Sequence, residues 1–160
     1  MKEKDAFGKA RLDGILNALS AGETGNDELR EAGRRSELRA IEETGLASEK
    51  KFTRYAGNVD FIECVQDAVP YEDVYDGIDK WLRFKEYKKL PDIPVQVKSS
   101  FKDVRLFRES PKYRQLRGME IVINCGPSIT YEKFLMQLSD EVERIEVSLK
   151  NDPSLGRFIV

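Results

Sequence analysis

The chain has 160 residues, of which 40% are hydrophobic and 35% are charged, and its formal net charge is −2. This length and composition suit a globular domain with a real core, and the mild acidity excludes a globally basic, histone-like binder. The sequence contains no histidine, which excludes Ser-His-Asp and Cys-His catalysis and HExxH zinc sites by residue type. Hydrolytic chemistry would therefore have to use carboxylate, amide and lysine groups around a hard metal ion.

Two further features indicate a soluble cytoplasmic protein. No apolar run approaches the ~20 residues that are needed to span a membrane, and the N-terminus has no apolar core of a signal peptide. The two cysteines, Cys64 and Cys125, each lie in an apolar, strand-like run, where a buried and reduced thiol is the common case. We therefore expect neither a membrane partner nor a disulfide.

Two helices are predicted at the start of the chain. Apolar residues at helical spacing favour an amphipathic helix over residues 4–19. Asn26 or Asp27 can cap a second, highly charged helix that runs to about Glu43, with Gly45 just past its end. The pair could form a helix-turn-helix that reads DNA or a simple packing hairpin. We expect residues 1–25 to be a helical extension and residues 26–160 to be the main domain.

Three strands are predicted in the middle of the chain. Residues 50–55 form a polar approach to a first strand over 58–65, which is apolar enough to be covered on both faces. A hairpin follows over residues 76–100, with strands at 77–84 and 93–99 and a lysine-rich turn that ends at Pro91-Asp92.

The second hairpin strand carries an unusual pair of polar residues. Because residues two apart share a face, Gln96 and Lys98 point away from the apolar neighbours Ile93, Val95 and Val97. Asp79, near the start of the partner strand, can meet that pair. Its carboxylate, the main-chain carbonyl of Val97 and the Gln96 amide oxygen would suit Mg²⁺ or Mn²⁺. Lys98 would then orient a water and offset charge on a phosphate; a structural hairpin with an extended lysine is the alternative.

The sequence Gly77-Ile78-Asp79, followed after sixteen residues by Gln96-Val97-Lys98, resembles the motif of the PD-(D/E)XK nuclease superfamily. It is most similar to the branch with glutamine in place of the second acid, as in Mrr-like restriction nucleases. The resemblance implies a restriction-endonuclease-like αβββαβ core and Mg²⁺-dependent DNA cleavage. Two departures are that no proline precedes Asp79 and that Gln96 brings no charge to the metal.

The resemblance also implies a glutamate on the first core helix that faces the metal. Glu37, in the run Gly33-Arg34-Arg35-Ser36-Glu37, matches that position. The alternative is that Glu37 is a solvent-exposed residue of the helix with no role at the metal, and both interpretations remain open.

A basic segment surrounds and follows the motif. Residues 80–118 contain twelve basic and four acidic residues, so they carry a charge of +8, and the remainder of the −2 chain carries −10. Such a segment suits a phosphate backbone. The residues expected to contact nucleic acid are Ser99, Ser100, Lys102 and Arg105. The aromatic residues Phe101, Phe107 and Tyr113 could stack on bases or anchor a core.

The C-terminal part completes the predicted α/β fold. Residues 119–125 indicate a buried strand, and Ser128 or Thr130 can cap a long helix whose apolar stripe covers the sheet or forms a homodimer seam. The tail is an edge strand or a loose end. The predicted class is thus α/β with a central mixed sheet between helices. The predicted function is a metal-dependent DNA endonuclease, with a non-cleaving module that binds nucleic acid or protein, or a structural oligomer, as alternatives.

Overall fold

The computed structural model describes residues 3–159, and the chain divides into two compact units between residues 46 and 47. The first unit is residues 1–46 and the second is residues 47–160. The division falls inside a single helix, α2 (Asn26–Ala56), whereas the sequence predicts a boundary at residue 25. A boundary inside a continuous helix has no linker composition, so the sequence carries no signal for it.

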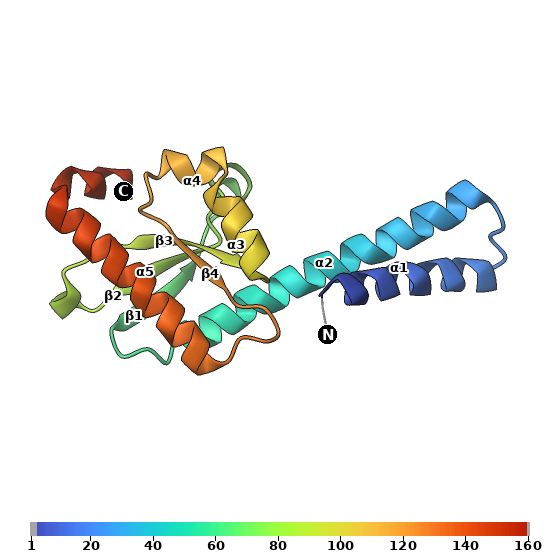
Figure 1. Cartoon of the computed structure of the whole chain (residues 1–160), viewed down its shortest axis with the longest axis horizontal. Helices are drawn as coiled ribbons and strands as arrows, with labels where there is room; N and C mark the ends of the chain where they lie inside the picture. Colours follow the sequence, from blue (N-terminus) through green and yellow to red (C-terminus); the bar gives the residue numbers. More distant parts are fainter. Residues whose placement is uncertain (1–2, 160) are drawn as a thin grey trace. The chain divides into compact units, whose positions relative to one another are not determined.

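The first unit is a hairpin made of α1 (Glu3–Ser20) and the first part of α2, which lie side by side (Figure 1). Two glycines allow the helices to approach closely. A Cβ atom added to Gly14 would lie 2.6 Å from the Cβ of Ser36, and one added to Gly33 would lie 2.9 Å from Ile15. This is the packing hairpin, and not the helix-turn-helix, of the two predicted alternatives.

Helix α2 extends well beyond its predicted end. The sequence predicts an end near Glu43 because Gly45 follows, but the helix runs on to Ala56. An interior glycine costs a helix only about 1 kcal/mol. Phe52 and Ala56 are fully buried in the hydrophobic core, and their burial stabilises the last turns. Residues 50–55, predicted as a polar approach to the first strand, therefore belong to this helix instead.

A four-stranded mixed sheet forms the centre of the second unit, in the order β1-β2-β3-β4. Its strands are β1 (Ile62–Asp67), β2 (Lys80–Phe84), β3 (Ile93–Lys98) and β4 (Ile121–Asn124). The first three are antiparallel neighbours, and β4 runs parallel to β3. The predicted β2–β3 hairpin is confirmed. The predicted starts of β1 and β2 are too early: residues 58–61 form turns, and residues 77–79 are an irregular segment that follows a π-helical segment (Glu72–Asp76).

Helices complete the second unit. They are α3 (Phe101–Arg108), α4 (Pro111–Gln115) and α5 (Tyr131–Asn151). The first two connect β3 to β4, since parallel strands need a crossover between them. The side chains of Ser100, Ser110 and Thr130 cap the three helices. The C-terminal segment Pro153–Phe158 is a 3-10 helix, which is neither of the two predicted forms.

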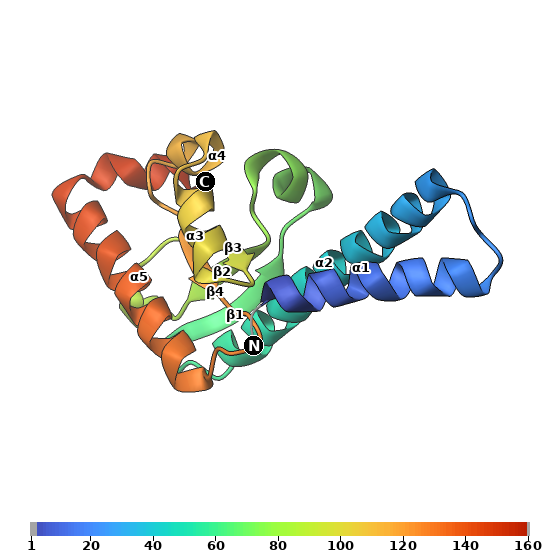
Figure 2. The same cartoon turned by 45° about the vertical axis from the view of Figure 1, so that its right-hand side comes forward.

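The sheet lies between helices, as Figure 2 shows for α5 and α3. One face of the sheet packs against α5 and the last turns of α2. The largest buried side chains of this core are Phe52, Leu82, Ile93, Met119, Ile121, Ile123, Phe134, Leu138 and Ile145. The predicted apolar stripe of α5 therefore covers the sheet. The predicted α/β class with a mixed sheet flanked by helices is confirmed.

The outer edge of β4 is closed by side chains. The backbone N–H of Val122 donates to Glu141 at 3.5 Å, and that of Asn124 donates to Gln137 at 3.1 Å. Arg108 of α3 donates to the carbonyl of Val122 at 3.4 Å. These contacts satisfy backbone groups that a further strand would otherwise pair with.

Candidate active site

Asp79 lies directly before β2, where the chain enters the β2–β3 hairpin. Its backbone N–H donates to the carbonyl of Val95 at 2.9 Å, which extends the strand pairing by one residue. Its carboxylate oxygen Oδ2 accepts hydrogen bonds from the N–H of Val97, at 2.6 Å, and from the side-chain amide of Gln96. The hairpin thus brings Asp79 and Gln96 together, as the strand alternation predicts.

The environment of Asp79 disfavours its charged form. Its pKa is raised to about 7, chiefly because the carboxyl is buried and also because the charge of Glu49 is near. The hydrogen bond from Val97 and the charge of Lys98 lower the pKa, but less than burial raises it. A bound cation would relieve this penalty, and perturbed carboxyls of this kind concentrate at functional sites.

Lys98 ends β3 on the sheet face of Gln96. Its Nζ lies 4.8 Å from the ring centroid of Phe107 on α3, which is a cation–π contact. The charge of Lys98 lowers the pKa of both Asp79 and Glu120. Among the described side chains, however, Lys98 forms no direct ion pair. The charge of the amine therefore acts on two carboxyls, although it forms a direct ion pair with neither.

Val97 contributes its backbone to the site. The carbonyl of Lys98 accepts a hydrogen bond from Cys125 at 2.8 Å, so it points toward β4. Because successive carbonyls of a strand point in opposite directions, that of Val97 points toward β2 and Asp79. The predicted third oxygen donor is thus on the correct side of β3.

Glu120 is an acidic residue of this region that the sequence pattern does not single out. It directly precedes β4 and is fully buried, and neither of its carboxyl oxygens has a hydrogen-bond partner in the described part of the chain. Its pKa is raised to about 9, first by burial and then by the charge of Asp79, whereas Lys98 lowers it. The feature of the sequence that could have identified Glu120 is that an acidic residue lies near the start of the apolar run over residues 119–125.

Glu49, near the end of α2, is the helix glutamate that acts on Asp79 within the second unit. It forms an ion pair with Lys80 at 3.7 Å, and its charge raises the pKa of Asp79. Its own pKa is raised, mainly because it is partly buried. The sequence places Glu49 outside the helix, because the predicted helix ends near Glu43.

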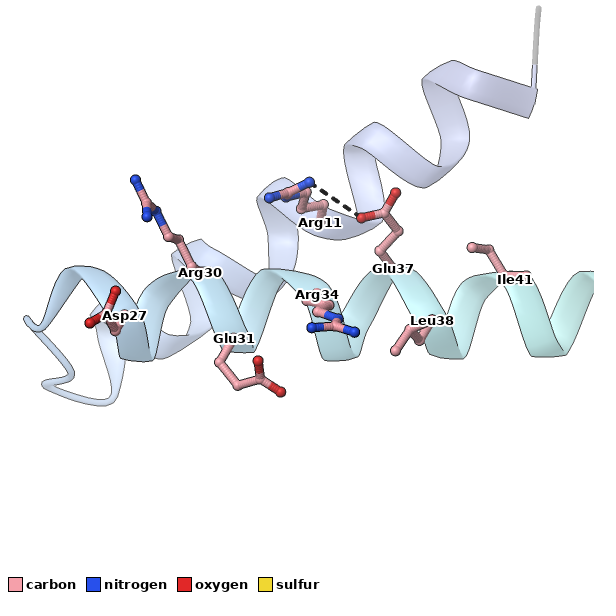
Figure 3. A pocket seen from close by; sticks show the side chains of 8 residues that line it. All are labelled: Arg11, Asp27, Arg30, Glu31, Arg34, Glu37, Leu38 and Ile41. Carbon is pink, nitrogen blue, oxygen red and sulfur yellow. Dashed lines mark ion pairs between the residues drawn. The ribbon is translucent and has the colours of Figure 1, made fainter.

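Glu37 lies in the first unit, where its carboxylate pairs with Arg11 at 3.5 Å (Figure 3). A groove beside this pair has charged residues of both signs, namely Arg11, Arg30, Arg34, Asp27, Glu31 and Glu37. The balance of charge gives this groove no preference for an anion. A role of Glu37 at the metal stays a prediction.

Gly77 sets the path of the chain toward Asp79. It ends the π-helical segment with φ 71°, and its N–H donates back to the carbonyl of Glu72. A Cβ atom at this position would lie 3.0 Å from both Phe107 and Lys112. The left-handed backbone and the close approach of α3 and α4 both require glycine here.

The residues predicted to contact nucleic acid lie at the start of α3. Ser100 caps this helix: its hydroxyl accepts from the N–H of Asp103 at 3.1 Å and donates to the Asp103 carboxylate at 2.7 Å. Lys102 and Arg105 are exposed, and Ser99 is half-buried. Lys102 and Arg105 are thus accessible to a ligand, whereas the hydroxyl of Ser100 is already engaged.

Part of the basic excess of residues 80–118 serves the fold. The basic side chains that pair with acids include Lys80, Arg83, Lys88 and Arg108. The three aromatic residues of this segment also differ in how they are packed. Phe107 packs edge-on against Tyr113 with ring centroids 6.3 Å apart, whereas Phe101 is exposed. Of these three rings, Phe101 is the exposed one that could stack on an unpaired base.

Comparison with known proteins finds no family model, curated protein or solved structure that matches this chain. Within residues 3–159, no three acidic or cysteine side chains are grouped so that they could hold a metal ion by themselves. No helix in the same range is long and apolar enough to cross a membrane. Any metal site at Asp79 would therefore need amide, main-chain or substrate oxygens as further ligands.

Proposed function

We propose that the second unit is a Mg²⁺- or Mn²⁺-dependent DNA endonuclease of the PD-(D/E)XK type. The order of its elements supports this proposal: the end of α2, three antiparallel strands, the crossover helices and the parallel strand β4 correspond to αβββαβ. The strongest support is that Oδ2 of Asp79 accepts hydrogen bonds from both Gln96 and Val97. These bonds join the two halves of the motif, which lie on different strands.

The oxygen donors of the site fit a hard divalent cation. The Asp79 carboxylate, the Gln96 amide oxygen and the Val97 carbonyl are the ligands that we assign to it. The raised pKa of Asp79 reflects the burial of its carboxyl, which the hydrogen bond from Val97 and the charge of Lys98 do not offset. When bound, such an ion would polarise a phosphodiester and lower the pKa of a water.

The remaining side chains have separate roles in this proposal. Lys98 holds its charge beside the scissile phosphate, where it orients the attacking water and offsets developing negative charge. Lys102 and Arg105 neutralise backbone phosphates from the exposed face of α3. Cys64 and Cys125 are free thiols, which fits the reducing cytoplasm in which we place the enzyme.

The test is cleavage of supercoiled plasmid, linear duplex and single-stranded DNA with Mg²⁺, with Mn²⁺ and with chelator. We expect cleavage that requires the metal, is lost in Asp79→Ala and Lys98→Ala, and is partly retained in Gln96→Glu. Lys85→Ala is the matched control for Lys98→Ala, because Lys85 is exposed on the same hairpin. Circular dichroism establishes that each variant is folded.

A non-cleaving DNA-binding module is the second candidate. The observation that favours it is that Gln96 is neutral and donates its amide N–H to Asp79. Wild-type protein that binds each DNA form but cuts none with either metal would establish this alternative. Protein that neither binds nor cuts DNA at low salt would reject both candidates.

A further inference from the structure

Glu120 is a buried carboxyl whose side chain lacks the partners that the fold gives to other buried polar groups. It is 0% exposed, and neither carboxyl oxygen accepts a hydrogen bond from the described residues. Its backbone, in contrast, is held firmly, because its carbonyl accepts a hydrogen bond from Arg144 at 3.0 Å. A buried carboxyl without partners is strongly unfavourable, so a native protein that keeps one calls for an explanation.

The strand register places Glu120 on the face of the sheet that carries the site. Val122 pairs with Gln96, and Asn124 pairs with Lys98, so these four residues share one face of the sheet. Glu120 lies two residues before Val122 and falls on the same face by the same alternation. The charges that act on Glu120 are those of Asp79, Lys98, Asp76 and Lys112, all of which belong to this region.

We propose that Glu120 is a direct ligand of the divalent cation that Asp79 binds, and that it supplies the second carboxylate that Gln96 does not. This inference rests on the metal site of the proposed function. Asp79 alone would offer one negative charge to a doubly charged ion, whereas Asp79 and Glu120 together offer two. The number of charged ligands is a main determinant of affinity at oxygen-rich cation sites.

Lys98 does not already fill this role. Its amine lies over the ring of Phe107, and it makes no ion pair with Glu120 among the described contacts. A cation between Asp79 and Glu120 would satisfy both carboxyls at once. Lys98 would stay available for the phosphate.

The experiment measures Mn²⁺ binding to the full-length chain by isothermal titration calorimetry without DNA. Glu120→Gln keeps the size of the side chain and should weaken binding at least about tenfold. Glu120→Asp keeps the charge but shortens the reach, so its loss should be smaller. Glu146→Gln is the control: this glutamate of α5 pairs with Lys88, and its substitution should leave the affinity unchanged. Equal affinity of Glu120→Gln and wild type would overturn the inference.

A second measurement needs no variant. Mn²⁺ added to ¹⁵N-labelled wild-type protein should broaden the amide signals of Asp79, Val97, Glu120 and Ile121 at substoichiometric concentration, because the ion is paramagnetic. Broadening at Asp79 and Val97 that leaves Glu120 and Ile121 sharp would reject Glu120 as a ligand. Absence of any broadening or binding heat would reject it as well.

These outcomes separate the inference from the proposed function. If Mn²⁺ binds through Asp79 and Glu120 but no DNA is cut, the ligand assignment stands and the nuclease proposal fails. If DNA is cut with metal but Glu120→Gln binds Mn²⁺ and cuts DNA as wild type does, the nuclease proposal stands and the ligand assignment fails.

Discussion

Two buried glutamates next to β4 differ sharply in what surrounds them. Glu141 of α5 pairs with Arg108 at 2.7 Å and Arg144 at 3.0 Å, and it accepts a hydrogen bond from Val122. Glu120, at the start of β4, has no side-chain partner among the described residues. Both are almost inaccessible to solvent, at 8% and 0% exposed.

The difference teaches how this fold distributes charge. At Glu141 the charge closes the edge of β4 and is balanced inside the protein, so it serves stability. Asp79 and Glu120 are buried and form no ion pair among the described contacts, which lowers stability; in the function that we propose, a bound cation would supply the missing balance. Measurements of stability and binding can therefore tell the two regions apart.

The largest expected effect is a dependence of stability on pH that comes from Glu120. Its pKa is about 9 in the folded protein against an ordinary value of 4.5, so between these values the folded state holds a proton that the unfolded state has lost. The free energy of unfolding should therefore fall as pH rises, by about 1.4 kcal/mol per pH unit, or about 4 kcal/mol between pH 5 and 8. Urea denaturation of wild type and Glu120→Gln across this range measures it.

The direction of this pH dependence follows from the raised pKa of Glu120. The stability of Glu120→Gln has no such dependence on this side chain, so relative to this variant the wild type should be most stable at acidic pH and should become progressively less stable as the pH rises toward 9. Parallel stability curves for the two proteins would mean that Glu120 is not protonated in the folded state.

The next effect is the loss of the balanced glutamate. Glu141→Gln should destabilise the domain by about 3 kcal/mol, because two arginines and the edge of β4 lose a charged partner. Denaturant unfolding at pH 7 measures the change, and Glu120→Gln, which removes no partner, should not be destabilised there. A Glu141→Gln protein as stable as wild type would contradict a structural role for this cluster.

A smaller contrast separates the two basic residues of these regions. Arg108→Ala should destabilise by about 2 kcal/mol, because Glu141 loses one of its two arginine partners. Lys98→Ala should cost no more than about 1 kcal/mol, which is the size of its contact with Phe107. If DNA is cleaved, only Lys98→Ala should abolish cleavage by the folded protein. Equal losses of stability in Arg108→Ala and Lys98→Ala would contradict this difference between the two regions.

The smallest effect is stabilisation by metal. Mn²⁺ at ten times its dissociation constant should raise the free energy of unfolding by about 1.4 kcal/mol through mass action. Asp79→Asn should lose this gain, whereas Glu141→Gln should keep it despite its lower melting temperature. A thermal-shift titration of the three proteins measures it, and a gain that survives in Asp79→Asn would place the ion elsewhere.

Alternation in a single strand was enough to predict the meeting of Asp79 with Gln96. Strand faces repeat every two residues and a hairpin pairs its neighbours locally, so residues 76–100 carry their own structural signal. The apolar stripe on α5 could be predicted for a similar reason, because apolar residues at helical spacing identify the face that covers a core. Whether this pairing is catalytic stays a prediction.

Glu49 and Glu120 were decided by tertiary structure. The burial of Phe52 and Ala56 carries α2 past Gly45, so Glu49 reaches the neighbourhood of Asp79 in spite of a local signal to end the helix. The crossover through α3 and α4 then sets β4 parallel to β3 and brings Glu120 to the face of Gln96. Both placements depend on contacts between segments far apart in the chain, which no local pattern encodes. The sequence by itself determined the local hairpin and its polar pair, whereas long-range packing decided which other carboxyls surround them.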